Sequence, residues 1–265
     1  MPTYAGGAIL ILFLLLALLG HVVAPHGADD QNLIDALAAP SRAHTFGTDP
    51  LGRDVLSRVI LGTRLTMSAA LIATGAALVV GVFLGVVAGY TDNGASAGVG
   101  ALIDLMLTIP SLVLAVALAS ILGAGLFGLV VALSLTFVPP MARLVRGRVL
   151  EIGAEDYVQA ARALGGAPRR IMFRHVLPNA VSVILVEASL SAGQAVLVAA
   201  ALGFLGLGVQ PPAPEWGTML GAGREYMDSA PHLVLGPGLA ISVLILGFNL
   251  FGDGLRDRFD RERAS

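Results

Sequence analysis

EIGAEDYVQAARALGGAPRRIMFRHVLPN, residues Glu151 to Asn179, is the one long polar segment within the hydrophobic half of the chain. Apolar residues recur at helical spacing between Ala154 and Leu164, and polar residues fall between them, which predicts an amphipathic helix. The pair Gly165–Gly166 ends that helix. Pro168 suits the first turn of a second short helix, which Pro178 should stop. The segment therefore predicts a helix-turn-helix.

Apolar segments flank this helix-turn-helix on both sides. The 265-residue chain is 56% hydrophobic and 13% charged, which leaves too little polar surface to coat a soluble globule. Six apolar segments predict membrane spans: residues 4–20 with Val22 and Val23, then 65–91, 101–121, 126–140, 180–202 and 233–251. The first has no basic start and no small-residue cleavage site, which favours a span over a cleaved signal peptide. We expect an all-α integral membrane protein with six transmembrane helices.

Arginine residues predict the side of the membrane that the helix-turn-helix faces. The densest basic region of the chain comprises this element and the segment before it: Arg143, Arg146, Arg148, Arg162, Arg169, Arg170 and Arg174. Because basic loops stay in the cytoplasm, we expect the helix-turn-helix to be cytoplasmic. Four spans precede it and two follow it, so the N- and C-termini should be cytoplasmic as well.

Some residues inside the spans differ from their apolar surroundings. Glycines recur about once per helical turn in the second span and predict close approach of a neighbouring helix: Gly75, Gly81, Gly85 and Gly89. Pro110 can kink the third span, and Glu187 and Gln194 share one face of the fifth. These three are candidates for a translocation path, with a role in packing alone as the alternative. Asp104 lies near the start of its span and should snorkel to the interface.

Other residues mark where spans should end. The fourth span should end at the pair Pro139–Pro140, and a helix that carries Arg143, Arg146 and Arg148 should lead on into the helix-turn-helix. Trp216, the single tryptophan, suits a membrane–water interface after the fifth span. A short charged tail follows the sixth.

The polar loop after the first span contains HTFGTDPLGRDVLSR, residues 44–58. Its Gly, Thr and Asp residues predict turns followed by a capped helix start. A plain structured loop, in which Asp and Arg pair locally, is the alternative that the residues leave open. The candidate residues of this external loop are Gly47, Thr48, Asp49, Gly52, Arg53 and Asp54.

The helix-turn-helix resembles the EAA loop of ABC-importer permeases. The resemblance rests on residues at the spacing of that motif: Ala160, Ala161, Gly165, Leu177 and Pro178. Gln159 stands where Glu is usual, and His175 stands where Ile is usual. The form RHVLPN, residues 174–179, is similar to that of the dipeptide, oligopeptide and nickel branch.

Two more phrases resemble the same branch. FGTDPLGRD at residues 46–54 is similar to the signature before the second span of its C-type subunits, and FLGLGVQPPAPEWG at residues 204–217 is similar to a second signature. The resemblance implies a type I ABC importer fold. It places the first transmembrane helix and external loop in residues 1–64 and a five-helix permease core in residues 65–265, with the coupling loop at residues 151–179.

The resemblance also implies partners and a site. It implies a permease subunit of the bacterial inner membrane, paired with a second homologous permease, two cytoplasmic ABC ATPases that bind ATP and Mg²⁺, and an external substrate-binding protein. The helix-turn-helix would be the coupling element that docks on an ATPase, through small residues that allow close contact and Arg side chains that complement the partner's charge. Its residues are Tyr157, Gln159, Ala160, Ala161, Arg162, Gly165, Arg169, Arg170, His175, Leu177 and Pro178.

The sequence argues against chemistry in the chain itself. It has no lysine, so no Gly-x-x-x-x-Gly-Lys-Ser/Thr nucleotide site can form, and it has no His-Glu-x-x-His pair or Gly-x-Ser-x-Gly elbow. The absence of cysteine excludes disulfides and thiolate metal sites. We therefore expect a non-catalytic subunit with no cofactor or metal of its own and no nucleic-acid partner.

Other functions are alternatives to this reading. A secondary transporter or channel would need coupling charges near the bilayer midplane, where Glu187 is the best candidate. A scaffolding protein would not require a long cytoplasmic helix-turn-helix. Among ABC importers we expect dipeptides or short oligopeptides as substrates, with nickel or another small solute as the alternative. The absence of a His-rich or Met-rich pore lining disfavours nickel.

Overall fold

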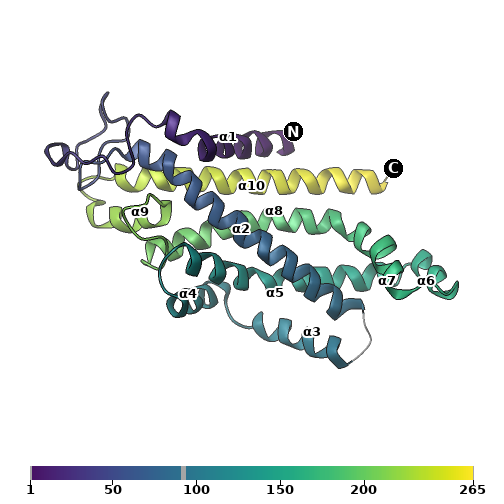
Figure 1. Cartoon of the computed structure of the whole chain (residues 1–265). Coiled ribbons are helices and arrows are strands. Elements are labelled where there is room, and N and C mark those ends of the chain that lie inside the picture. The colour runs from purple at the N-terminus through teal and green to yellow at the C-terminus, as the bar shows by residue number, and fades with distance from the viewer. Residues whose placement is uncertain (1, 91–93, 265) are drawn as a thin grey trace.

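The computed structural model describes residues 2–90 and 94–264. Within them the regular secondary structure is helical (Figure 1), beside one isolated bridge between Thr48 and Asp54. The longer helices are α1 (Pro2–Val23), α2 (Val55–Tyr90), α3 (Gly94–Met106), α4 (Ser111–Leu122), α5 (Leu126–Gly153), α8 (Leu177–Phe204) and α10 (His232–Ala264). The shorter elements are η1 (Leu33–Asp35), α6 (Asp156–Ala163), α7 (Pro168–Ile171), the π-helix η2 (Met172–Val176), α9 (Trp216–Gly223) and η3 (Arg224–Tyr226).

The lengths of these helices fit a membrane protein. Among the described residues, five helices are long and apolar enough to cross a membrane, and one bent pair raises the number to six if it forms a single span. The bent pair is α3 and α4, whose axes differ by 93°. The all-α membrane architecture that the sequence predicts is thus confirmed.

The predicted third span, residues 101–121, is a broken helix rather than a kinked one. α3 ends at Met106 and α4 begins at Ser111, with Pro110 between them at a non-helical ψ of 131°. Proline also disfavours the helical conformation in the residue before it, so the chain leaves the helix at this point. The predicted end of the second span, Thr91, and the link that starts at Asp92 lie outside the described residues.

The helix continues beyond Pro139–Pro140 as predicted, whereas Pro178 does not stop its helix, contrary to the prediction. α5 continues through Pro139–Pro140 to Gly153, and α7, η2 and α8 follow one another without a break through Pro178. The π-helical turn at Met172–Val176 shifts the hydrogen-bond register just before Pro178 and so accommodates its missing N–H. The second arm of the helix-turn-helix is therefore the direct extension of α8.

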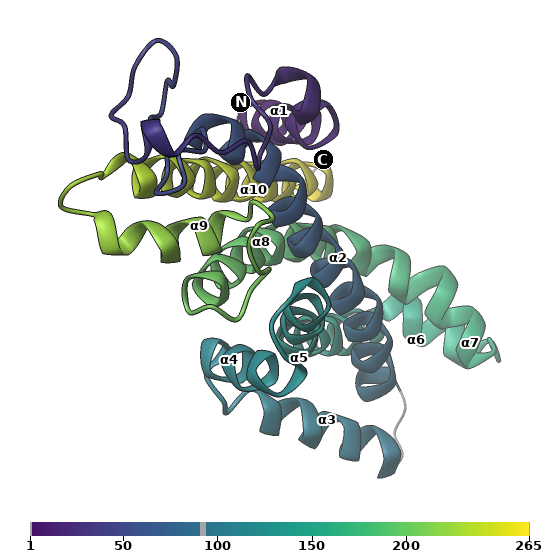
Figure 2. The same ribbon diagram turned by 60° about the vertical axis from the view of Figure 1, so that its left-hand side comes forward.

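The bundle has two different ends (Figures 1 and 2). Residues 24–54 and 205–231 gather at one end, which we call the loop end, while α6 and α7 project from the opposite end. We call the helix-turn-helix, residues 151–179, the bracket. Both termini point toward the bracket end, and α1 lies beside α10. If α3 and α4 form one span, the chain crosses six times, which is the predicted even number and places both termini at one end.

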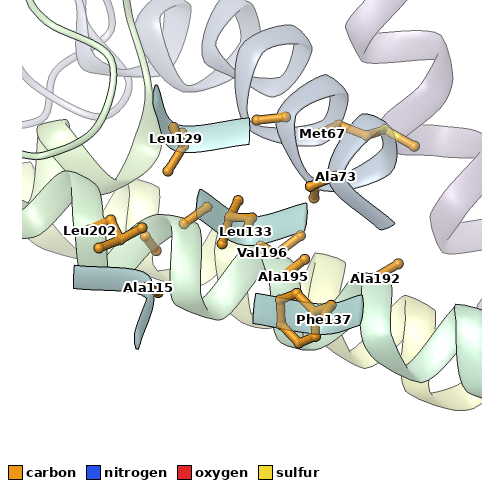
Figure 3. Close-up of a cluster of buried hydrophobic side chains, with 14 of the residues drawn as sticks. Met67, Ala73, Ala115, Leu129, Leu133, Phe137, Ala192, Ala195, Val196 and Leu202 are labelled. Carbon is orange, nitrogen blue, oxygen red and sulfur yellow. The ribbon is translucent and has the colours of Figure 1, made fainter. Parts of the chain in front are cut away.

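The core lies where α2, α5 and α8 meet (Figure 3). Leu129, Leu133 and Phe137 of α5 pack there among buried side chains that include Met67, Ala73, Ala115, Ala192, Ala195, Val196 and Leu202. Many of these are alanines, which let the helix axes approach closely.

The glycines of α2 lie against α5, which confirms the predicted close approach of a helix. A Cβ atom at Gly81 would lie 2.7 Å from the Cβ of Met141, and one at Gly85 would lie 2.6 Å from the carbonyl oxygen of Ala142. Gly75 differs, because a Cβ atom there would have no neighbour within 4 Å.

Candidate functional site

The inner face of the bracket attaches it to the bundle. Val158, Ile171 and Met172 are buried in an apolar cluster with the last turns of α5. At the end of α2, the Tyr90 hydroxyl donates a hydrogen bond of 2.7 Å to the carbonyl oxygen of Pro168. The bracket therefore contacts α2 and α5 and continues into α8.

The turn of the bracket is a glycine-terminated helix end. The amide of Gly165 donates to the carbonyl of Arg162 at 2.9 Å, and the amide of Gly166 donates to the carbonyl of Ala161 at 3.0 Å. Gly165 has φ +79°, the left-handed conformation that this Schellman arrangement requires. A Cβ atom at Gly165 would meet nothing within 4 Å in this chain, so the backbone conformation accounts for the glycine without any close contact.

Hydrogen bonds from polar side chains brace the bracket from within. Nε2 of Gln159 donates to the carbonyl oxygen of Gly153 at 2.8 Å, which satisfies a terminal carbonyl of α5. A glutamate in its place could not donate this bond when ionised. Nδ2 of Asn179 contacts the Tyr157 hydroxyl at 3.2 Å and the His175 carbonyl at 2.6 Å, and the rings of Tyr157 and His175 have centroids 6.3 Å apart.

The outer face of the bracket exposes large apolar and basic side chains together. Leu164 is 88% exposed, and Tyr157 and Phe173 are also exposed. The arginines of the bracket are also exposed, namely Arg162, Arg169, Arg170 and Arg174, although the Arg162 guanidinium lies over the Tyr90 ring of α2, 5.6 Å from its centroid. Of the other predicted coupling residues, Ala160 and Pro178 are exposed, and Ala161, His175 and Leu177 are half-buried. Such a mixed surface suits a protein partner.

Two of the predicted translocation-path residues lie on α8. Glu187 is half-buried and accepts a hydrogen bond of 3.2 Å from the Ser191 hydroxyl, and Gln194 is exposed. Glu187 lines a cavity of about 340 Å³ together with Leu144, Ser182, Val183, Val186, Leu190, Arg256 and Phe259. Pro110 is exposed at the break between α3 and α4.

Asp104 pairs with two arginines of α5. Its carboxylate lies 3.5 Å from Nη1 of Arg146 and 4.0 Å from Nε of Arg143. The pairing joins α3 to α5 and neutralises the charge. That Asp104 reaches the membrane interface stays a prediction.

The loop end is ordered by residues of the FGTDPLGRD phrase. The Asp49 carboxylate accepts bonds from the amides of Leu51 and Arg53 at 2.9 and 3.0 Å and pairs with Nε of Arg53 at 2.6 Å. The Thr48 hydroxyl donates to the carbonyl of Asp35. Local Asp–Arg pairing and turn chemistry, which the sequence offered as alternatives, both occur.

Glycines permit the turns of this phrase. Gly47 and Gly52 have φ of +72° and +71°, and a Cβ atom at Gly52 would lie 1.8 Å from the carbonyl oxygen of Asn32. No other residue type fits Gly52 without moving that loop.

Asp54 caps the start of α2. Its Oδ2 accepts bonds from the amide and the hydroxyl of Ser57 at 2.8 and 2.7 Å, and its Oδ1 lies 2.9 Å from Nδ1 of His44. Burial alone would raise the pKa of the Asp54 carboxyl, but the bonds from Ser57 and His44 and the nearby His26 more than offset this, so the pKa is lowered.

The structure adds contacts that the sequence did not reveal. Arg58, the last residue of the segment 44–58, is buried. Its guanidinium donates a hydrogen bond of 3.1 Å to the carbonyl oxygen of Pro212 and lies 3.4 Å from the Asp29 carboxylate. It thereby ties the first loop to the segment after α8. The pairing joins residues far apart in the chain, so no local pattern could have indicated it.

Trp216 is buried within the protein and is not at an interface, contrary to the prediction. It is 0% exposed, and its Nε1 donates to the carbonyl of Val59 at 2.9 Å. Next to it, the buried Glu215 carboxylate caps α9 by accepting bonds from the amides of Gly217 and Thr218. Burial raises the pKa of the Glu215 carboxyl, and these hydrogen bonds offset part of that shift.

Comparison with known proteins identifies the class to which this helical chain belongs. Residues 81–265 match the family of binding-protein-dependent transport system inner membrane components, and residues 3–40 match the N-terminal TM domain of oligopeptide transport permease C. The chain belongs to this family of ABC-importer permeases, and it is a non-catalytic, multi-pass transmembrane subunit.

Similar relatives are peptide permeases. The chain is 42% identical to the dipeptide transport system permease protein DppC of Alkalihalophilus pseudofirmus, over 98% of this chain and 86% of the relative. It is 44% identical to the di/tripeptide transport system permease protein DppC of Pseudomonas aeruginosa, over 96% and 86%. It is 40% identical to the glutathione transport system permease protein GsiD of Pectobacterium atrosepticum, over 98% and 87%.

A solved structure shares the fold. The inward-facing MetNI methionine ABC transporter contains a chain that superposes with a TM-score of 0.62 at 22% identity, covering 76% of this chain and 95% of that one. The type I importer fold that the sequence resemblance implied is thereby supported by three-dimensional similarity.

Proposed function

We propose that this chain forms half of the membrane pathway of an ATP-driven importer of dipeptides or short oligopeptides. Its partners would be a second homologous permease, two ABC ATPases that bind ATP and Mg²⁺, and an extracytoplasmic substrate-binding protein. The observation that carries the proposal is the bracket, which exposes Leu164, Phe173 and four arginines although its inner face is packed against the bundle. A surface of this kind at one end of a permease suits an ATPase as its partner.

The attachment of the bracket supports its role in coupling. A displacement of the bracket would act directly on α8, because α7 and η2 continue into that helix. It would also act on α5 through the apolar cluster around Val158 and on α2 through the bond from Tyr90 to Pro168. Movement of the ATPases would therefore tilt three packed helices together, as alternating access requires.

The charge distribution supports an orientation. With the arginine-rich bracket in the cytoplasm, both termini lie on the cytoplasmic side and the loop end faces outward. The external loop motif, Gly47 to Asp54, would then help to order the surface that receives the binding protein.

The relatives support short peptides as the substrate class. The names of two relatives, at 42% and 44% identity, specify dipeptides or di- and tripeptides, and glutathione, the named substrate of another at 40%, is itself a small peptide. Glutathione is therefore the second candidate, and nickel is less well supported. We retain Glu187, Gln194 and Pro110 as candidates for the translocation path.

Transport itself tests the proposal. We would purify the complex from its native membrane, reconstitute it in proteoliposomes with its binding protein, and measure uptake of a labelled dipeptide and of labelled glutathione. ATP-dependent uptake that survives an uncoupler is the expected result. Uptake that ignores ATP and stops with the uncoupler would instead establish a secondary transporter.

A matched pair of variants tests the bracket. Leu164→Asp places a charge on the outer face, whereas Ile34→Asp does so at the loop end, where Ile34 is 93% exposed. Only Leu164→Asp should reduce co-purification of the ATPases. Equal recovery of the ATPases with both variants would contradict the assignment of the bracket.

A further inference from the structure

Two histidines and an aspartate meet at the loop end, away from the bracket and from the candidate residues of the translocation path. Nδ1 of His44 lies 2.9 Å from Oδ1 of Asp54, and Nδ1 of His26 lies 3.8 Å from Oδ2 of the same carboxylate. The two imidazole rings have centroids 5.0 Å apart. One potential ligand atom from each residue lies within 4.8 Å of the other two.

A second layer of hydrogen bonds holds these groups in place. The Ser57 hydroxyl donates to Oδ2 of Asp54 at 2.7 Å and accepts a bond of 3.0 Å from the backbone amide of His26. Ser57 thus links the backbone of one histidine to the carboxylate and fixes both. Metal ligands in proteins are commonly oriented by such outer hydrogen bonds.

The exposure of the cluster suits an exchangeable ion. The Asp54 side chain is 2% exposed, whereas those of His44 and His26 are 17% and 39% exposed. The carboxylate lies at the base and the imidazoles lie toward solvent, so an ion could enter from outside. A water molecule could then complete the coordination.

The donor set selects the class of metal. Imidazole nitrogen with one carboxylate oxygen suits borderline divalent ions such as Zn²⁺, whereas Ca²⁺ and Mg²⁺ prefer oxygen alone. Bonds of about 2.0–2.1 Å to a tetrahedral Zn²⁺ place its ligand atoms roughly 3.3 Å apart. The ligand atoms of the cluster lie within 4.8 Å of one another, so binding of Zn²⁺ would draw them closer together.

We propose that His26, His44 and Asp54 form a binding site for Zn²⁺, which fastens the loop after α1 to the start of α2. The site differs from the sequence-based expectation of no metal, because its ligands are far apart in the chain and match no short motif. It does not depend on the identity of the transported substrate.

Metal titration of the full chain tests the site. The protein would be purified in detergent with a tag that contains no histidine, stripped with a chelator, and titrated with Co²⁺ as a spectroscopic probe and with Zn²⁺ by calorimetry. We expect one saturable site per chain, with the visible absorption of tetrahedral Co²⁺ that Zn²⁺ displaces. His26→Gln and His44→Gln should each weaken binding at least tenfold, while His21→Gln on α1 should leave it unchanged.

The stability of the chain provides a second readout. Zn²⁺ should raise the unfolding temperature of the wild type and of His21→Gln, and should not raise that of the two ligand variants. All variants must remain monodisperse without metal, which separates loss of a ligand from loss of the fold. Absence of saturable binding in the wild type, or equal binding by all variants, would show that the cluster is a hydrogen-bonded helix cap only.

Discussion

The close contact between α2 and α5 yields a quantitative prediction. Gly85→Ala would place a Cβ atom 2.6 Å from the carbonyl oxygen of Ala142 and 2.6 Å from the Cβ of Val145, whereas ordinary van der Waals contact begins near 3.4 Å. Both neighbouring atoms are close to the backbone of α5 and cannot rotate away. The two helices must therefore separate by most of an ångström or deform.

The expected cost follows from this overlap. Overpacking of a well-packed interface costs about 1–3 kcal/mol, while alanine in place of a helical glycine recovers at most about 1 kcal/mol. Gly75→Ala on the same helix meets no atom within 4 Å and should be neutral or slightly stabilising. We expect Gly85→Ala to be less stable than Gly75→Ala by about 1–3 kcal/mol.

Unfolding of the two variants in mixed detergent micelles measures this difference. The free energy of unfolding would be obtained from SDS titrations followed by circular dichroism, with the wild type as reference. Equal free energies for Gly75→Ala and Gly85→Ala, or the reverse order, would refute the close packing of α2 on α5.

Three further predictions concern the two ends of the bundle. Gly165→Ala forces a Cβ atom into the left-handed region at a cost of about 1–2 kcal/mol, so ATPase co-purification should fall, whereas Gly147→Ala in α5, with an open environment, should be neutral. The lowered pKa of Asp54 stabilises the fold above the ordinary value of 3.8, and this contribution is lost as the pH falls through the lowered pKa. Ser57→Ala removes a bond that lowers this pKa, so the midpoint of acid unfolding should move to higher pH; an unchanged midpoint would contradict the assigned bond. Gln159→Leu should reduce thermal stability by about 1 kcal/mol through loss of its bond to the α5 terminus, and equal melting of variant and wild type would argue against that bond.

Much of the architecture could be predicted because it depends on local sequence. A span is recognisable from an apolar segment of sufficient length, and Gly165 ends a helix wherever it can adopt a positive φ. The glycines of α2 likewise indicated a close neighbour, since only the lack of a side chain permits such an approach. These features require no knowledge of what lies beside them.

Helix ends at prolines were predicted less well. Pro178 does not end its helix, because a π-helical turn precedes it. At Pro110, where both neighbouring helices are more exposed, the chain does break. The same residue type therefore has opposite effects, and the surrounding packing determines which one occurs.

The sequence by itself determined that this is a helical membrane protein with an arginine-rich bracket and the motifs of a peptide-importer permease. Only the tertiary structure decided that Trp216 is buried, that Arg58 reaches Pro212, and that His26 and His44 meet at Asp54. Hydrophobic length and backbone conformation are properties of a segment. Burial and ligand geometry arise only when segments distant in the sequence are packed together.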